Sequence, residues 1–173
     1  MKRTFFSLAL LLAVATLTAQ TKMTAREAAV KIADRILAST TYEFKNTKTG
    51  EIYKSVKKLP LDMDVKVACK YNNWHYTNGV TNMALMELGD KLGDKKYEKY
   101  VLKNMNFVFN EGNLDFFRKQ YDEAFKRDGW NAVRKLSWHM IFRGKRLDDN
   151  GPMGASLIEL QLKYPNDSFL GYI

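Results

Sequence analysis

The sequence predicts an all-α fold built from successive helical hairpins. Apolar residues recur at helical spacing through most of the 173 residues, and no segment shows a convincing strand-like alternation. The helical segments are joined by short corners, which favours a bundle or a helical toroid. The composition is that of a globular protein, since 46% of the residues are hydrophobic and 27% are charged.

The first 20 residues have the order of a signal peptide. Lys2 and Arg3 precede an apolar run over residues 5–16 and a stretch of small residues that ends near residue 20. The apolar run is shorter than the roughly 20 residues of a membrane-spanning helix. We therefore expect cleavage near residue 20, no stable membrane insertion afterwards, and one periplasmic or secreted domain over residues 21–173.

Three helices are expected in the first part of the mature chain. Thr24 and Glu27 have the spacing of a capping box before the first helix. Gly93 and Asp94 form a short corner between the second and third helices, which predicts an antiparallel hairpin. The three helices are predicted at residues 25–38, 78–92 and 95–110.

The other segments are less regular. Residues 41–61 have no clear periodicity and end at Pro60, so we interpret them as an irregular connection. Asp167 and Ser168 resemble the cap of one more short helix, which we expect to find no partner. The abrupt end indicates a truncated, poorly folded chain. Further helical patterns occur around residues 116–125, 132–142 and 152–164.

Charge and cysteine content narrow the classes of ligand. Removal of Lys2 and Arg3 lowers the formal charge from +9 to +7, and the remaining charge is spread along the chain, which favours anionic partners. No dense basic tract or zinc-finger spacing supports nucleic-acid binding, so acidic polysaccharides are better candidates. Cys69, the single cysteine, excludes an intrachain disulfide and a thiolate-rich metal site, and we expect it to be buried.

Aromatic residues precede the predicted second helix. Trp74, His75 and Tyr76 bring ring faces and hydrogen-bonding groups to a helix N-terminus, which suits a sugar ring with an apolar face and a hydroxyl rim. The alternative is that the rings pack in the core while Thr77 or Asn78 caps the helix. The region 130–146 is also rich in aromatic residues, and we expect Trp138 and His139 there to serve packing.

Two adjacent carboxylates precede the helix predicted from residue 152. Asp148 and Asp149 cannot face one way on a regular backbone, so one can cap the helix while the other faces a cavity. A carboxylate at a helix N-terminus is favoured in its charged form, which suits a base or a group that orients water. A simple capping role is the alternative.

Three tracts, in this order, resemble glycoside hydrolase families 88 and 105, and the chain is similar to an unsaturated rhamnogalacturonyl hydrolase. The resemblance covers residues 28–173 and is strongest over residues 73–161. The tracts are Trp-His-Tyr-Thr-Asn-Gly-Val at 74–80, Gly-Asp-Lys-Lys-Tyr at 93–97 and Arg-Leu-Asp-Asp-Asn-Gly-Pro-Met-Gly-Ala at 146–155.

The resemblance implies an (α/α)6 barrel, of which this chain would be the N-terminal portion. Its substrate would be a 4,5-unsaturated uronic acid at the non-reducing end of a pectin-derived oligosaccharide, and it would use no metal and no organic cofactor. In these families an aspartic acid protonates the vinyl ether, water adds at C5, and the hemiketal collapses to release the sugar.

The resemblance also implies roles for individual residues. Asp149 matches the earlier family aspartate, which is followed by a variable residue and a glycine, and is the expected catalytic residue. Trp74, His75, Tyr76 and Asp148 are expected to bind substrate, and the proton-donating aspartate is expected beyond Ile173. Two alternatives remain open: a non-catalytic exported module that binds acidic glycans, and a helical interaction scaffold. The sequence does not predict the oligomeric state.

Overall fold

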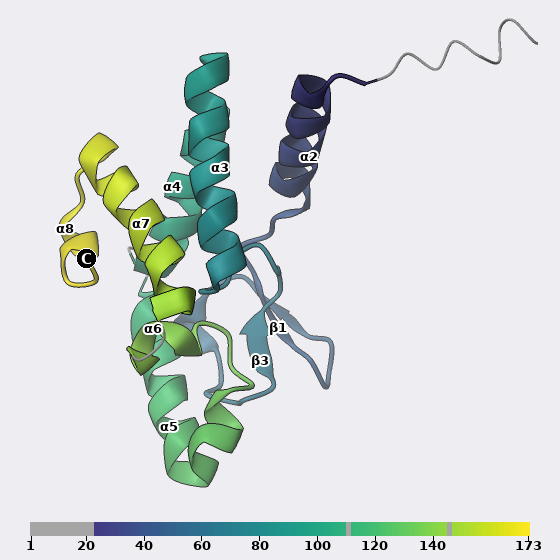
Figure 1. The fold of residues 1–173 in the computed structure, drawn as a ribbon. Coiled ribbons are helices and arrows are strands. Elements are labelled where there is room, and N and C mark those ends of the chain that lie inside the picture. The colour runs from purple at the N-terminus through teal and green to yellow at the C-terminus, as the bar shows by residue number, and fades with distance from the viewer. Residues whose placement is uncertain (1–22, 110–111, 145–146) are drawn as a thin grey trace, which may run out of the picture. The chain divides into compact units, whose positions relative to one another are not determined.

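The computed structural model describes residues 23–109, 112–144 and 147–173 and is mostly helical (Figure 1). A division between Ile32 and Ala33, within the first helix, separates two compact units, and the larger one contains the sheet and all later helices. The helices are α2 (Ala25–Ser39), α3 (Tyr76–Leu92), α4 (Lys96–Phe109), α5 (Asn113–Val133), α6 (His139–Arg143), α7 (Leu147–Lys163) and α8 (Asp167–Leu170).

Helix α2 begins with the predicted capping box. The backbone N–H of Thr24 donates to Glu27 Oε2 at 2.8 Å, and the N–H of Glu27 donates to Thr24 Oγ1 at 3.2 Å. These reciprocal bonds satisfy N–H groups that have no partner within the helix. The prediction of a helix from residue 25 is confirmed.

The segment between α2 and α3 is a small sheet, so the prediction of an irregular connection was wrong. Strands β1 (Phe44–Asn46), β2 (Ile52–Tyr53) and β3 (Val65–Val67) form an antiparallel sheet in the order β2-β1-β3. Phe44 pairs with Tyr53 on one side and Val67 on the other. Strands of two or three residues are too short to show an alternating pattern, which is why the sequence concealed them.

Asn46 closes the β1–β2 hairpin. Its Oδ1 accepts hydrogen bonds from the N–H groups of Lys48 and Thr49, and its carbonyl accepts one from Gly50. Gly50 has a φ of 79°, a left-handed conformation that favours glycine. After β2, a single 3-10 turn, Val56–Lys58, leads toward β3.

Helices α3 and α4 form the predicted hairpin. Gly93 ends α3 with a φ of 65°, and its N–H donates to the carbonyl of Asp90. Asp94 then begins the return, because its Oδ1 accepts a hydrogen bond from the N–H of Lys96 at 3.0 Å. The Gly-Asp corner thus stops one helix and starts the next.

Helices α3 and α7 pack side by side and run in the same direction (Figure 1). Near their starts, Gly79 lies against the backbone of Pro152 and Met153. Near their ends, Lys163 Nζ lies 2.9 Å from both carboxylate oxygens of Asp90. The order of these two contacts along both helices establishes the parallel arrangement.

Helix α7 begins five residues earlier than predicted. Its first residue is Leu147, so Pro152 lies inside the helix instead of in its first turn. Proline has no N–H to donate to the carbonyl of residue 148, which weakens the first part of α7. The aspartates at 148 and 149 are therefore residues of the helix and do not precede it.

A break at residues 128–129 separates the helical patterns predicted around residues 116–125 and 132–142. Asp128 and Gly129 have non-helical backbone angles and divide α5 into two parts. The helix predicted around 132–142 is much shorter, because α6 begins only at His139. Trp138 before it has a φ of 63°, and its N–H donates to Asn73 Oδ1 at 2.9 Å, which holds the chain in a turn.

One hydrophobic core joins the sheet to the helices. Cys69 is buried in the interior, as predicted. The expectation that α8 finds no partner was wrong, since Phe169 is fully buried and its ring lies 5.5 Å from that of Phe109. The largest fully buried side chains include those of Trp138, Tyr97, Phe44, Phe169, Met105, Met153, Leu157 and Leu160.

Candidate functional site

A cleft of about 550 Å³ opens where the start of α3 meets the end of α5, α6 and the start of α7. The cleft combines aromatic rings with charged groups. Its lining consists of His75, Tyr76, Trp130, Arg134, His139, Met140, Arg143 and Asp148.

His75 is the N-cap of α3, a role that the sequence had assigned to Thr77 or Asn78. Its backbone is extended, with φ −152° and ψ 144°, and its Nδ1 accepts a hydrogen bond from the N–H of Thr77 at 3.4 Å. The same nitrogen lies 2.9 Å from Thr77 Oγ1. Asn78 instead turns inward and donates to the carbonyls of Lys70 and Asn73. The loop before α3 is thus held in place, with His75 at the cleft.

Tyr76 follows His75 and lies at the edge of the cleft. The two rings are 4.7 Å apart between centroids, and 46% of the Tyr76 surface is exposed. An exposed ring beside an open cleft can stack on the apolar face of a bound molecule.

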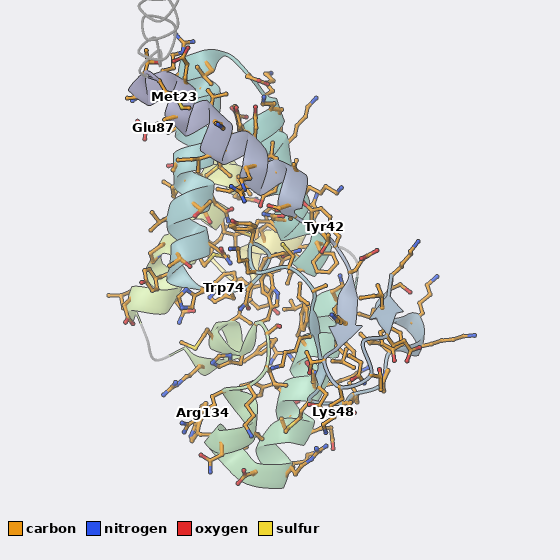
Figure 2. The ribbon with its side chains drawn as sticks, turned by 90° about the vertical axis from the view of Figure 1, so that its right-hand side faces the viewer. Met23, Tyr42, Lys48, Trp74, Glu87 and Arg134 are labelled. Carbon is orange, nitrogen blue, oxygen red and sulfur yellow. The ribbon has the colours of Figure 1, made fainter. Side chains whose placement is uncertain are left out.

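Trp74 (labelled in Figure 2) lies in the core, and it is not among the residues that line the cleft. Only 4% of its surface is exposed, and its ring packs against Trp138 at 5.9 Å and Phe109 at 6.3 Å. Its Nε1 donates to Asn150 Oδ1 at 2.7 Å. Trp74 therefore supports the cleft from behind by joining the segment before α3 to the first turns of α7.

The opposite wall of the cleft comes from α5 and α6. Trp130 is 43% exposed, and the guanidinium of Arg143 lies 4.9 Å from the centre of its ring. Arg134 lies one turn after Trp130 and donates from Nε to the Trp130 carbonyl at 3.3 Å. This wall presents one aromatic face and two permanently charged guanidinium groups.

Of the two aspartates in the third tract, only Asp148 has a side chain that the structure describes. Asp148 is exposed and lines the cleft. Asp149 belongs to the first turn of α7, but its side chain lies outside the described part of the chain. Among the charged groups that line the cleft, two arginines outnumber one carboxylate, so the lining favours an anion.

Five of the eight residues that line the cleft were not predicted from the sequence to be site residues. The structure brings the predicted residues His75, Tyr76 and Asp148 together, although they are about 70 positions apart. Trp130, Arg134 and Arg143 were not among the predicted site residues, and His139 had been assigned to packing but also lines the cleft. The spacing of Trp130 and Arg134, four positions apart on a helix, was the available signal.

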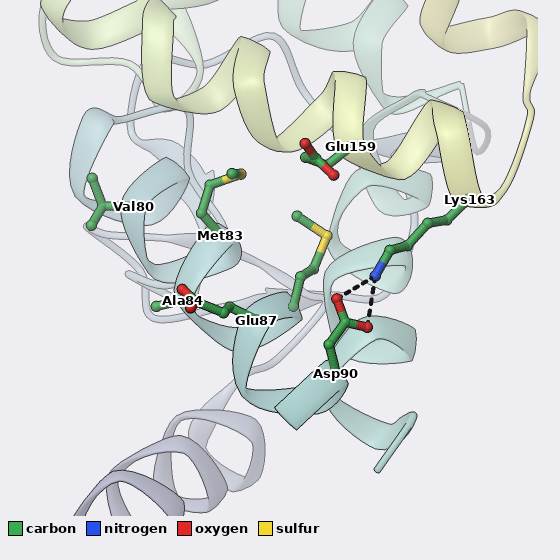
Figure 3. A pocket seen from close by; sticks show the side chains of 8 residues that line it. Val80, Met83, Ala84, Glu87, Asp90, Glu159 and Lys163 are labelled. Carbon is green, nitrogen blue, oxygen red and sulfur yellow. Dashed lines mark hydrogen bonds and ion pairs between the residues drawn. The ribbon is translucent and has the colours of Figure 1, made fainter. Parts of the chain in front are cut away.

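A second hollow, of about 460 Å³, lies between α3 and α7 (Figure 3). Its lining is apolar at Val80, Met83, Ala84 and Met86 and acidic at Glu87, Asp90 and Glu159. Lys163 closes one end through its ion pair with Asp90. This groove has no ring for stacking and is rimmed by carboxylates, so it suits an acidic sugar less well than the cleft does.

The described residues contain no group of three His, Cys, Asp or Glu side chains arranged to hold a metal ion. Across the same residues, no helix is both long enough and apolar enough to cross a membrane. The predicted signal peptide, residues 1–20, lies outside the described residues.

Neither a protein-family model nor a curated protein matches this chain.

Proposed function

We propose that this chain binds an acidic oligosaccharide in the cleft and belongs to a glycoside hydrolase that acts on 4,5-unsaturated uronic acids. One observation carries the proposal: a single cleft combines exposed aromatic faces with two guanidinium groups and a carboxylate. Tyr76 and Trp130 offer faces to a sugar ring, while Arg134 and Arg143 match the charge of a uronate.

The proposed reaction is hydration of a vinyl ether. A proton adds to C4 of the unsaturated ring, water adds its oxygen to C5 and loses its own proton, and the resulting hemiketal opens to release the adjoining sugar. The resemblance gives Asp149 the water-orienting role, and it assigns the proton donor to no residue up to Ile173. The position of Asp149 in the first turn of α7 supports the water-orienting role, because the helix N-terminus favours the charged form of a carboxylate.

The proposed architecture is an (α/α)6 barrel. Two features support it: α3 and α4 form an antiparallel hairpin, and α7 runs parallel to α3 beside it. Repeated hairpins arranged around a ring have this relationship, since the first helices of successive hairpins lie parallel. The signal-like residues 1–20 support export of the domain.

The function is tested by mixing a form of the protein that includes the proton-donating aspartate with an unsaturated digalacturonide and following the ultraviolet absorbance of its double bond. Loss of absorbance with release of a saturated sugar is the expected result. A saturated digalacturonide is the control, because it offers the same charge without the reactive bond. Full retention of absorbance while the unsaturated sugar binds would contradict the enzymatic proposal.

The second candidate is a non-catalytic module that binds acidic glycans. It is favoured by the side chains described in the cleft, because Tyr76, Trp130, Arg134 and Arg143 could bind a uronate without any reaction. Calorimetric binding that is equal for saturated and unsaturated sugars, with no change in absorbance, would support this candidate.

A further inference from the structure

A small internal cavity lies where the loop before α3 meets α3 and α4. Its volume is about 10 Å³, and four of the side chains around it are asparagines that are buried or nearly so. That volume corresponds to about one water molecule. The lining includes Asn72, Asn78, Asn82, Asn104, Met105 and Trp138.

Some of these asparagines have protein partners. Asn78 Nδ2 donates to the carbonyls of Lys70 and Asn73, at 3.0 and 2.9 Å. Asn104 Oδ1 accepts a hydrogen bond from Tyr42 Oη at 2.8 Å. The carbonyl end of Asn104 is therefore occupied, which leaves its amide end to be satisfied from elsewhere.

Three polar atoms around the cavity lack a protein partner. Among the described residues, no partner lies in good hydrogen-bonding geometry to Asn72 Nδ2, Asn72 Oδ1 or Asn104 Nδ2, although the hydroxyl of Tyr100 lies near the Asn104 amide. Asn72 is only 2% exposed and Asn104 only 4%, so bulk solvent does not serve these atoms. Folded proteins satisfy nearly all such buried groups, directly or through ordered water.

The unpaired atoms define what the cavity can hold. Two are N–H donors, on Asn72 and Asn104, and the third is the carbonyl acceptor of Asn72. A metal cation cannot accept hydrogen bonds, and a halide cannot donate one. Water does both, and exchange of the oxygen and nitrogen positions of Asn72 leaves the same set of groups to satisfy.

We propose that this cavity binds one long-lived water molecule that accepts hydrogen bonds from Asn72 Nδ2 and Asn104 Nδ2 and donates one to Asn72 Oδ1. The site is distinct from the open cleft and does not depend on the function proposed for it. Polar cavities of this size, with two to four partners, are where buried water is found in proteins.

The water would complete a connection between distant segments. Tyr42, which precedes β1 (Figure 2), donates to Asn104 on α4, and the water would continue this chain to Asn72. On the other side, Trp138 Nε1 donates to the backbone carbonyl of Asn72 at 3.3 Å, and the backbone N–H of Trp138 donates to Asn73 Oδ1. The water would thus help to position the loop that leads to His75.

The test is to record NOE and ROE spectra between water and the side-chain amide protons of the full, ¹⁵N-labelled 173-residue chain. Asn72 and Asn104 should show cross-peaks of opposite sign in the two experiments, which indicates a water that stays bound much longer than surface water. The exposed Asn131 is the internal control and should not show this pattern.

Two variants locate the water. Asn104→Leu removes one donor and fills space, so the water cross-peaks of Asn72 should disappear. Asn72→Ser keeps a group that both donates and accepts, so the cross-peaks of Asn104 should remain. Absence of water cross-peaks from both asparagines in the unmodified protein would overturn the proposal. A crystal structure with a direct bond between these two side chains and no density in the cavity would also overturn it.

Discussion

Gly79 of α3 lies so close to the backbone of Pro152 in α7 that the two helices leave no room for a side chain at this position. A Cβ placed on Gly79 would collide with the Pro152 carbonyl carbon and with the Met153 nitrogen. These neighbours are backbone atoms of a helix and cannot rotate away, so the contact sets how closely α3 and α7 approach.

Gly79→Ala is therefore expected to lower the free energy of unfolding by about 1–3 kcal/mol, the usual cost of overpacking. Gly154→Ala is the matched control, because Gly154 lies in α7 with open space around the site of a new Cβ. That variant should be as stable as the parent or more so, since alanine favours a helix. Urea unfolding of both variants measures the effect, and equal stability of the two would show that α3 and α7 can separate without cost.

In a form of the protein that includes the proton donor, Asp149→Asn is expected to reduce turnover of an unsaturated uronide by about 10²–10⁴-fold, the usual contribution of a general acid or base. The amide keeps the shape of the carboxylate but cannot supply its charge. Asp148→Asn should reduce turnover less. If Asp149 serves only as a cap, asparagine should replace it almost fully, because Asn and Asp rank alike in that role. The assay follows ultraviolet absorbance, with variants matched for thermal stability, and near-normal turnover would remove Asp149 from the mechanism.

Arg143→Gln is expected to weaken binding of an unsaturated uronide by roughly 10- to 150-fold, since a hydrogen bond to a charged group contributes about 1.5–3 kcal/mol. The affinity of the parent chain should also fall with added salt, and the variant should show a smaller dependence. Arg127→Gln is the control, because Arg127 lies on α5 but does not line the cleft. Titration calorimetry at two salt concentrations measures both effects, and equal losses in the two variants would point to general charge attraction.

The pH dependence of stability should include a contribution from Asp90. The ammonium of Lys163, hydrogen-bonded to its carboxylate, holds the pKa of Asp90 below its ordinary value. A lowered pKa in the folded state means that the stabilisation is present above the unfolded value of about 3.9 and is lost as pH falls through the folded value.

Melting temperatures measured from pH 6 down to about pH 2, a range that spans the ordinary carboxyl pKa, should therefore fall less steeply for Asp90→Asn than for the parent. Glu159→Gln is the control, because Glu159 lines the same groove without an ion pair among the described residues. Parallel curves for the parent and Asp90→Asn would show that the ion pair has no effect on folding.

Export should produce a mature chain that starts near Gln20 or Thr21. The basic, apolar and small-residue segments at residues 1–20 have the order that signal peptidases recognise. Mass spectrometry of the exported protein measures the start directly. An exported chain that still carries residues 1–20 would contradict the assignment.

The helices were predictable because their signals are long and repeated. The apolar residues of α4 recur at helical spacing, which is visible in the sequence alone. The Gly93-Asp94 corner acts through local backbone chemistry, so it also required no knowledge of the tertiary structure. The strands were not predictable, since Phe44 and Val65 belong to strands of three residues and are buried by distant partners.

The cleft was only partly predictable for a related reason. Trp74 and Tyr76 are two positions apart and look alike in the sequence, yet one is a core residue and the other is at the surface. Trp130 and Arg143 come together through the kink at Gly129 and the left-handed turn at Trp138. A non-glycine residue in that conformation is chosen by the surrounding packing, which local sequence patterns do not encode.

The hydrogen bond from Trp74 to Asn150 gives the two walls of the cleft different abilities to adapt. The donor is the buried ring of Trp74, which also packs against the ring of Trp138. The starts of α3 and α7 are therefore fixed to each other before any ligand binds. Arg143 and Trp130 meet through an exposed ring contact, which allows rearrangement at little cost. A ligand would thus meet one preorganised wall and one that orders on binding, so the entropy lost on association would come mainly from the arginine side.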